Sequence, residues 1–253
     1  MTSGQTMRAR FCSLGFRLSL LVITPVFTIG CLADPTYDDP TMLVAPYDTT
    51  QVWAVAPFLN ESGVSDVNGA DIADIFADQA ADVDGVTMLA VNRVINAMRY
   101  LDIERVATVG DARLLMNALD VDGLIVGTVT SYDPYRPPRL GMAVQLHSRP
   151  AYARSSELDT IALTRASTDH ASPGTLGPGY PVAQAAGVFD ASNHRIQQQL
   201  KSYARGRTER DTAFGDDIYL VSMDLYTQFV SYRLLSDLLD AEWTRESAER
   251  QDP

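Results

Sequence analysis

Apolar residues form two different patterns at the start of the folded region. Residues 52–58 are apolar almost without interruption, in the run VWAVAPF, which is typical of a strand buried on both faces. Over residues 70–80 the apolar positions instead recur every three or four residues, with Asp71, Asp74 and Asp78 between them. That spacing predicts an amphipathic helix whose aspartates face solvent.

The tetrapeptide Asp-Val-Asp-Gly occurs twice, at residues 82–85 and 120–123, each time between an amphipathic run and a β-rich apolar run. Glycine tolerates the left-handed backbone that ends many helices, so both copies are predicted to be helix-to-strand junctions. Calcium loops also contain this motif, but they need acidic ligands at further fixed positions. Those positions hold Val86, Met88 and Arg93 in one copy and Leu124, Val126 and Ser131 in the other, so calcium binding is disfavoured.

Further elements follow from the same patterns. Helices are predicted at 92–102 and 109–120, which gives the order strand, helix, strand, helix, helix, strand. This order predicts a sheet with helices packed on it. Leu140, Met142, Val144 and Leu146 alternate strictly with other residues, which is typical of a half-buried antiparallel strand. The remaining predictions are a strand at 156–168, a loop at 169–181, a strand at 182–192 and a helix from Asn193, with Asp190 and Asn193 in the capping turn.

The C-terminal part is predicted to hold one long helix. Residues 206–216 are polar and are expected to form a mobile loop, whereas 217–243 carry a wide apolar face that would pack on the domain or on a partner. Residues 244–253 are expected to be a disordered tail. The predicted fold class is therefore α/β (α+β), a mixed sheet flanked by helices over residues 51–205, with a long C-terminal helix.

The N-terminus has the three parts of an export signal. Arg8, Arg10 and Arg17 precede an apolar stretch of 13 residues, 18–30, which ends at Gly30 and Cys31. A membrane-spanning helix needs about 20 apolar residues, whereas a secretory signal needs roughly 7 to 15 and a small residue at the cut. The length therefore favours a cleaved signal peptide over residues 1–30.

The segment TIGC resembles a bacterial lipobox, in which the cysteine thiol receives a diacylglyceryl group and becomes the new N-terminus. The resemblance implies cleavage after Gly30 and lipidation of Cys31. Cys12 lies inside the leader, so cleavage leaves Cys31 without a disulfide partner. The alternatives are an ordinary cleaved signal with a chance cysteine, and a buried structural cysteine. Residues 31–50 contain three prolines and no regular period, so they are predicted to form a flexible tether.

The net charge of the chain limits the classes of partner that it can bind. The chain has a formal net charge of −12, and removal of the leader leaves 17 basic and 32 acidic residues, a net of −15. Such a body repels nucleic acid and anionic lipid, so a nucleic-acid-binding role is disfavoured.

No motif for catalysis, a metal or a cofactor is present in the sequence. His147, His170 and His194 are not spaced as metal ligands on one helix, and they are expected at the surface or in turns. A metal site assembled in space from scattered residues stays open. The segment RPPR, residues 136–139, with Tyr132 and Tyr135 beside it, is read either as a partner-facing edge or as a rigid turn between strands. The edge would be formed by Tyr132, Tyr135, Arg136 and Arg139.

Three stretches resemble an α/β domain that is shared by curli-secretion-channel-type lipoproteins and the amino-terminal part of the translocation protein TolB. The stretches are VWAVAPFLNESG, IADIFADQAADVDGVTML and ALDVDGLIVGTVTSYDP. The resemblance covers residues 50–132. It implies a non-enzymatic envelope binding, scaffold or assembly factor with an envelope protein partner or self-association. A subunit of an oligomeric secretion channel is the alternative, and a hydrolase with a spatially assembled site is a third hypothesis. Because Leu32 rather than Asp follows Cys31, the lipobox resemblance implies the periplasmic face of the outer membrane.

Overall fold

The computed structural model describes residues 41–149, 181–208 and 214–251. All described residues belong to one compact unit, which spans Tyr37–Pro253. Several predictions fall outside the described residues: the leader, Gly30 and Cys31, the strand expected at 156–168, and all but the last residue of the loop expected at 169–181.

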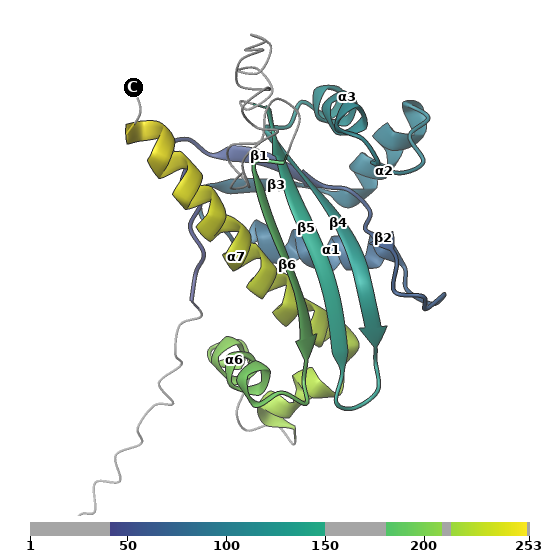
Figure 1. The fold of residues 1–253 in the computed structure, drawn as a ribbon, viewed down its shortest axis with the longest axis vertical. Helices are drawn as coiled ribbons and strands as arrows, with labels where there is room; N and C mark the ends of the chain where they lie inside the picture. The colour runs from purple at the N-terminus through teal and green to yellow at the C-terminus, as the bar shows by residue number, and fades with distance from the viewer. Residues whose placement is uncertain (1–40, 150–180, 209–213, 252–253) are drawn as a thin grey trace, which may run out of the picture. The chain divides into compact units, whose positions relative to one another are not determined.

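The described part begins with short strands and helices, continues with three longer strands and ends with helices, the last of which is the longest (Figure 1). The elements are β1 (Gln51–Val55), β2 (Leu59–Asn60), α1 (Gly69–Ala81), β3 (Val86–Leu89), α2 (Val91–Tyr100), α3 (Val109–Leu119), β4 (Gly123–Asp133), β5 (Arg139–Ser148), β6 (Ala183–Asp190), α6 (His194–Ala204), the 3₁₀ helix η1 (Gly215–Leu220) and α7 (Met223–Gln251). The predicted order of elements over residues 51–133 is confirmed, except that the short strand β2 was not predicted.

The strands form one mixed sheet in the order β3-β1-β4-β5-β6, and the short β2 pairs with β4. The β3-β1-β4 part is parallel, whereas β4, β5 and β6 pair antiparallel. Parallel strands need a crossover, which the helices between them provide. The predicted fold class, a mixed sheet flanked by helices with a long C-terminal helix, is confirmed.

Two apolar cores lie on opposite faces of the sheet. On one face, the alternating residues of β5 pack with α1 and α7, so the predicted antiparallel strand at 139–148 is confirmed. On the other face a smaller core joins β1 and β4 to α2 and α3. Val55 and Ile125 belong to the first core, and Ala54 and Leu124 to the second, which is why these strands lack alternation in the sequence.

The two Asp-Val-Asp-Gly copies both join a helix to a strand, but they turn differently. Gly85 has the left-handed φ of +87°, as predicted. In the second copy Asp120 takes this conformation, with φ +54°, so the prediction for Gly123 is wrong. Gly123 is instead required by close packing, because a Cβ there would lie 2.6 Å from the Trp53 ring. Asp122 accepts a hydrogen bond from the backbone N–H of Val52 at 2.9 Å, which fixes β1 beside β4.

The folded domain begins earlier than residue 51. We call residues 41–48 the N-terminal strap. Leu43 and Ala45 form backbone hydrogen bonds with Asp84 at 2.9 Å, and Ala45 is buried. The described end of the segment predicted as a tether, 41–50, is therefore part of the domain, because backbone pairing with the α1–β3 turn replaces its contacts with water.

The long C-terminal helix also extends beyond its predicted end. The segment predicted at 217–243 is divided into η1 and α7, and α7 continues to Gln251 through most of the expected disordered tail. Ion pairs of Arg245 with Glu242, Glu246 and Glu249 support these last turns. No helix in the described ranges combines the length and apolarity that crossing a bilayer requires.

Candidate functional site

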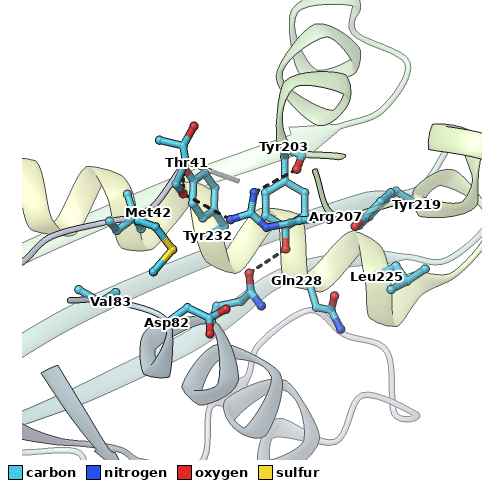
Figure 2. Close-up of a pocket in the computed structure, with 12 residues that line it drawn as sticks. Thr41, Met42, Asp82, Val83, Tyr203, Arg207, Tyr219, Leu225, Gln228 and Tyr232 are labelled. Carbon is cyan, nitrogen blue, oxygen red and sulfur yellow. Dashed lines mark hydrogen bonds between the residues drawn. The ribbon is translucent and has the colours of Figure 1, made fainter. Parts of the chain in front are cut away.

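A cleft of about 410 Å³ opens where α1, α6, η1 and α7 meet the N-terminal strap (Figure 2). We call it the tyrosine cleft, because Tyr203, Tyr219 and Tyr232 come from three different elements to line it. The strap contributes the first described residues of the chain to one wall. The other lining residues are Thr41, Met42, Leu43, Gln79, Asp82, Val83, Arg207, Leu225 and Gln228.

Arg207 lies over the rings of Tyr203 and Tyr232, with its guanidinium carbon 4.4 and 4.9 Å from the two ring centres. Its Nη1 donates to the backbone carbonyl of Tyr203 at 3.1 Å, and its Nη2 donates to that of Thr41 at 3.5 Å (Figure 2). Stacking and two hydrogen bonds together restrict the guanidinium orientation. Arg207 therefore joins the end of α6, the middle of α7 and the strap.

Tyr203 is held on its other side by Gln79. Its hydroxyl donates to the Gln79 Oε1 at 2.7 Å, across 124 residues of sequence. Burial raises the pKa of Tyr203, so the hydroxyl stays protonated near neutral pH and acts as a donor. This side chain is suited to binding rather than to proton transfer.

Local sequence explains how α6 presents these groups. The side chain of Asn193 accepts from the backbone N–H of Arg195 at 2.9 Å, so the predicted cap of this helix is confirmed. Gly206 then takes φ +77°, a conformation that costs glycine little. The chain turns there, which carries Arg207 back over the Tyr203 ring.

Side chains of α7 hold the N-terminal strap by its backbone. Trp243 Nε1 donates to the carbonyl of Val44 at 3.0 Å, and Arg250 Nη2 donates to that of Pro46 at 2.7 Å. Tyr232 donates to the Thr41 carbonyl at 3.5 Å. These contacts fix the path along which the chain leaves the domain, beside the tyrosine cleft.

A buried carboxylate anchors the same strap. Glu242 has no exposed surface, and it accepts from the Tyr47 hydroxyl at 2.8 Å and from Arg245 Nε at 2.9 Å. Burial and the charge of Glu242 raise the pKa of Tyr47, which keeps its hydroxyl protonated. A buried ion pair of this kind is stable only while its hydrogen bonds are made.

The predicted partner-facing residues lie elsewhere, in the β4–β5 hairpin (Figure 1). Tyr135, Arg136 and Arg139 are exposed, whereas Tyr132 is partly buried and packs against the larger core. Asp133 accepts from the backbone N–H of Tyr135 at 3.1 Å, which stabilises the turn. None of the four predicted residues lines the tyrosine cleft, and their role in partner binding stays a prediction.

The histidine prediction needs one correction. His147 is 6% exposed on β5 rather than at the surface, and burial lowers its pKa to about 4. His194 is exposed at the start of α6, as expected, and His170 lies outside the described residues. In the part of the chain that the structure describes, no three or more His, Cys, Asp or Glu side chains come together as they would around a metal ion.

Sequence reasoning did not identify Tyr203, Arg207 and Tyr232. The four-residue spacing of Tyr203 and Arg207 was visible, but a glycine turn rather than a helix brings these two together. Tyr232 lies within the apolar face of α7, where its position resembles that of an ordinary core residue.

Comparisons with known proteins give distant structural likenesses. No family model matches the chain, and no curated protein matches it. Similar solved structures include the LpoB C-terminal domain from Salmonella enterica, with 12% identity over 56% of this chain and 84% of that one and a TM-score of 0.38. Lipoprotein GNA1162 from Neisseria meningitidis has 16% identity over 60% of this chain and 91% of its own, with a TM-score of 0.37. A chain of the PelC dodecamer from Paraburkholderia phytofirmans has 12% identity over 80% of this chain and 94% of its own, with a TM-score of 0.33.

These likenesses are too distant to transfer an activity or a partner to this chain. The resemblance to curli-secretion-channel-type lipoproteins and to TolB therefore stays a prediction from the sequence.

Proposed function

We propose that this protein is a lipid-anchored, non-enzymatic binding protein of a bacterial cell envelope, and that its tyrosine cleft receives a segment of a partner protein. The observation that carries the proposal is the attachment of the N-terminal strap beside that cleft. The chain that leads back to Cys31 leaves the domain where recognition side chains converge.

The attachment limits how far the cleft lies from the membrane. Nine residues lie between Cys31 and Thr41, and a fully extended chain spans at most about 35 Å over that length. With Cys31 acylated at the bilayer surface, the length of chain between Cys31 and Thr41 keeps the start of the strap, and with it the cleft, within about this distance of the headgroups. A partner would therefore be an envelope protein that lies close to the membrane, with the periplasmic face of the outer membrane preferred.

The lining of the cleft is suited to protein recognition. Tyrosine and arginine are enriched among residues that dominate binding energy at protein interfaces, because each offers a large flat surface and a hydrogen-bonding end. Met42 lines the cleft and is 61% exposed, which adds an adaptable apolar contact at the rim. Among the described residues that line the cleft, none is a serine, cysteine or histidine, the residue types that most often act as a nucleophile or its base.

The anchor is tested by intact-mass spectrometry of the protein purified from membranes of the source bacterium. The expected species lacks residues 1–30 and carries a diacylglyceryl group on Cys31. A Cys31→Ala variant should remain unprocessed. A purified protein with residues 1–30 attached and an unmodified thiol would contradict lipid anchoring.

The cleft is tested separately by placing a photo-crosslinking amino acid at Gln228, which lines it, and at Asn92, which is exposed on α2 across the sheet. Crosslinking in living cells should give one specific adduct from position 228. The matched position 92 should not give that adduct. Equal adducts from both positions, or none from position 228, would remove the cleft as the partner site.

A further inference from the structure

The negative charge of this protein is unevenly distributed. Residues 193–208, which comprise α6 and the turn after it, contain Arg195, Lys201, Arg205 and Arg207 and no Asp or Glu. This stretch has a net charge of +4, whereas the rest of the chain has a net charge of −16. A local basic patch on an acidic protein attracts anions that the body as a whole repels.

A second cleft, of about 280 Å³, lies beside the tyrosine cleft and shares Arg207, Tyr203, Tyr232 and Thr41 with it. We call it the arginine cleft, because Arg195 from α6, Arg207 from the following turn and Arg233 from α7 all line it. Its other lining residues are Gln198, Gln199 and Ser202. Among the described residues, no Asp or Glu lines this cleft.

The three guanidinium groups have unused hydrogen-bonding capacity. Within the described ranges, no hydrogen bond or ion pair engages the Arg195 side chain, and Arg233 Nε is buried without an acceptor. Arg233 does pair with Asp237, at 3.4 Å on the exposed side of α7. Arg207 donates through two of its five N–H groups, and stacking on two tyrosines holds it in place.

We infer that the arginine cleft binds a phosphate group. Arginine presents a planar fork of donors that fits phosphate oxygens in a bidentate manner. Because Asp237 offsets the charge of Arg233, the three arginines leave a net of +2, which matches the one or two negative charges of a phosphate ester. Ser202 and the two glutamines add neutral donors around the same space. A bound phosphate supplies the acceptors that the described residues do not give to the Arg195 side chain.

The position of the cleft allows two sources of this phosphate. Thr41, the first described residue of the strap, lines the arginine cleft, so the phosphodiester of a lipid headgroup is one source. Free phosphate or a soluble phosphate monoester is the other. The inference does not rest on the proposed function, because it requires neither lipidation nor a protein partner.

The test measures binding to the full chain in an uncharged detergent by isothermal titration calorimetry at constant ionic strength. One titration uses inorganic phosphate, and another uses mixed micelles that contain phosphatidylglycerol, with phosphatidylcholine micelles as their reference. Arg195→Gln is the main variant, since this side chain is exposed and its replacement should leave the fold intact. Arg93→Gln is the matched control, an exposed arginine of α2 outside both clefts.

The wild-type protein should bind at least one of the two probes, and Arg195→Gln should weaken that binding by about tenfold. Arg233→Gln should weaken it by at least as much, and Arg93→Gln should leave it unchanged. Binding of inorganic phosphate identifies a soluble source, and binding only of the phosphatidylglycerol micelles identifies a headgroup. Absence of binding to both probes, or an equal loss in Arg195→Gln and Arg93→Gln, would overturn the inference.

Discussion

Replacing Tyr47 by phenylalanine should destabilise the protein although it removes only one oxygen atom. The Tyr47 hydroxyl is one of the donors to the fully buried carboxylate of Glu242, and Arg245 supplies the others. The ring itself stays in place, because its edge-on contact with Trp53, 5.9 Å between ring centres, does not involve the hydroxyl. The substitution therefore isolates one hydrogen bond to a buried charge.

A hydrogen bond to a charged group contributes about 1.5–3 kcal/mol to stability. Since Arg245 still pairs with Glu242, we expect Tyr47→Phe to lower the free energy of unfolding by about 2 kcal/mol. For a domain of this size, the melting temperature should fall by about 4–8 °C.

Urea unfolding followed by tryptophan fluorescence measures this effect, because Trp53 is buried beside Tyr47. The midpoint should shift while the slope of the transition stays constant. Tyr135→Phe is the matched control, since that tyrosine is 81% exposed, and its effect should stay within about 0.5 kcal/mol.

A double-mutant cycle with Glu242→Gln tests the reason for the effect. In that background the partner of the hydroxyl is neutral, so Tyr47→Phe should lower the free energy of unfolding by only about 1 kcal/mol. An equal loss in both backgrounds would refute the reasoning from a buried charge. A Tyr47→Phe protein as stable as Tyr135→Phe would refute it as well.

Two further predictions concern the sheet. Gly127→Ala should lower the free energy of unfolding in urea by about 1–3 kcal/mol, because the new Cβ would lie 2.4 Å from the Phe58 ring. The control is Gly110→Ala in α3, where the atom nearest to the new Cβ lies at 3.5 Å, so its effect should be neutral or slightly stabilising. Equal effects of the two substitutions would contradict the packing argument. Burial lowers the pKa of His147 to about 4, so below pH 6.5 the unfolded chain binds a proton that the folded chain does not. The free energy of unfolding should therefore be constant above pH 6.5 with respect to this group and fall by up to about 1.4 kcal/mol per pH unit down to pH 4. His147→Gln should flatten this part of the profile and exposed His194→Gln should not, whereas identical profiles would contradict the assignment.

The periodicity of apolar residues in the sequence was sufficient to predict the main strands of the sheet. Continuous apolar runs marked β1 and the first half of β4, and strict alternation marked β5, because each strand residue points to a face whose environment the side chain must match. The same pattern could not predict the last turns of α7. Those residues are nearly all polar, and their helix is stabilised by pairs such as Arg245 with Glu249 rather than by an apolar stripe.

The strap and the two clefts depended on the tertiary structure alone. The Tyr47–Glu242, Tyr203–Gln79 and Trp243–Val44 hydrogen bonds join residues that are 195, 124 and 199 positions apart in the sequence. A periodic pattern reports the surroundings of each residue along its own element, and it contains no information on which distant element supplies the partner. The sequence by itself therefore determined most of the sheet elements, and it predicts a leader that ends before Cys31. Only folding decided that Arg207 would stack on Tyr203 and Tyr232, because that contact requires three separate elements to pack together first.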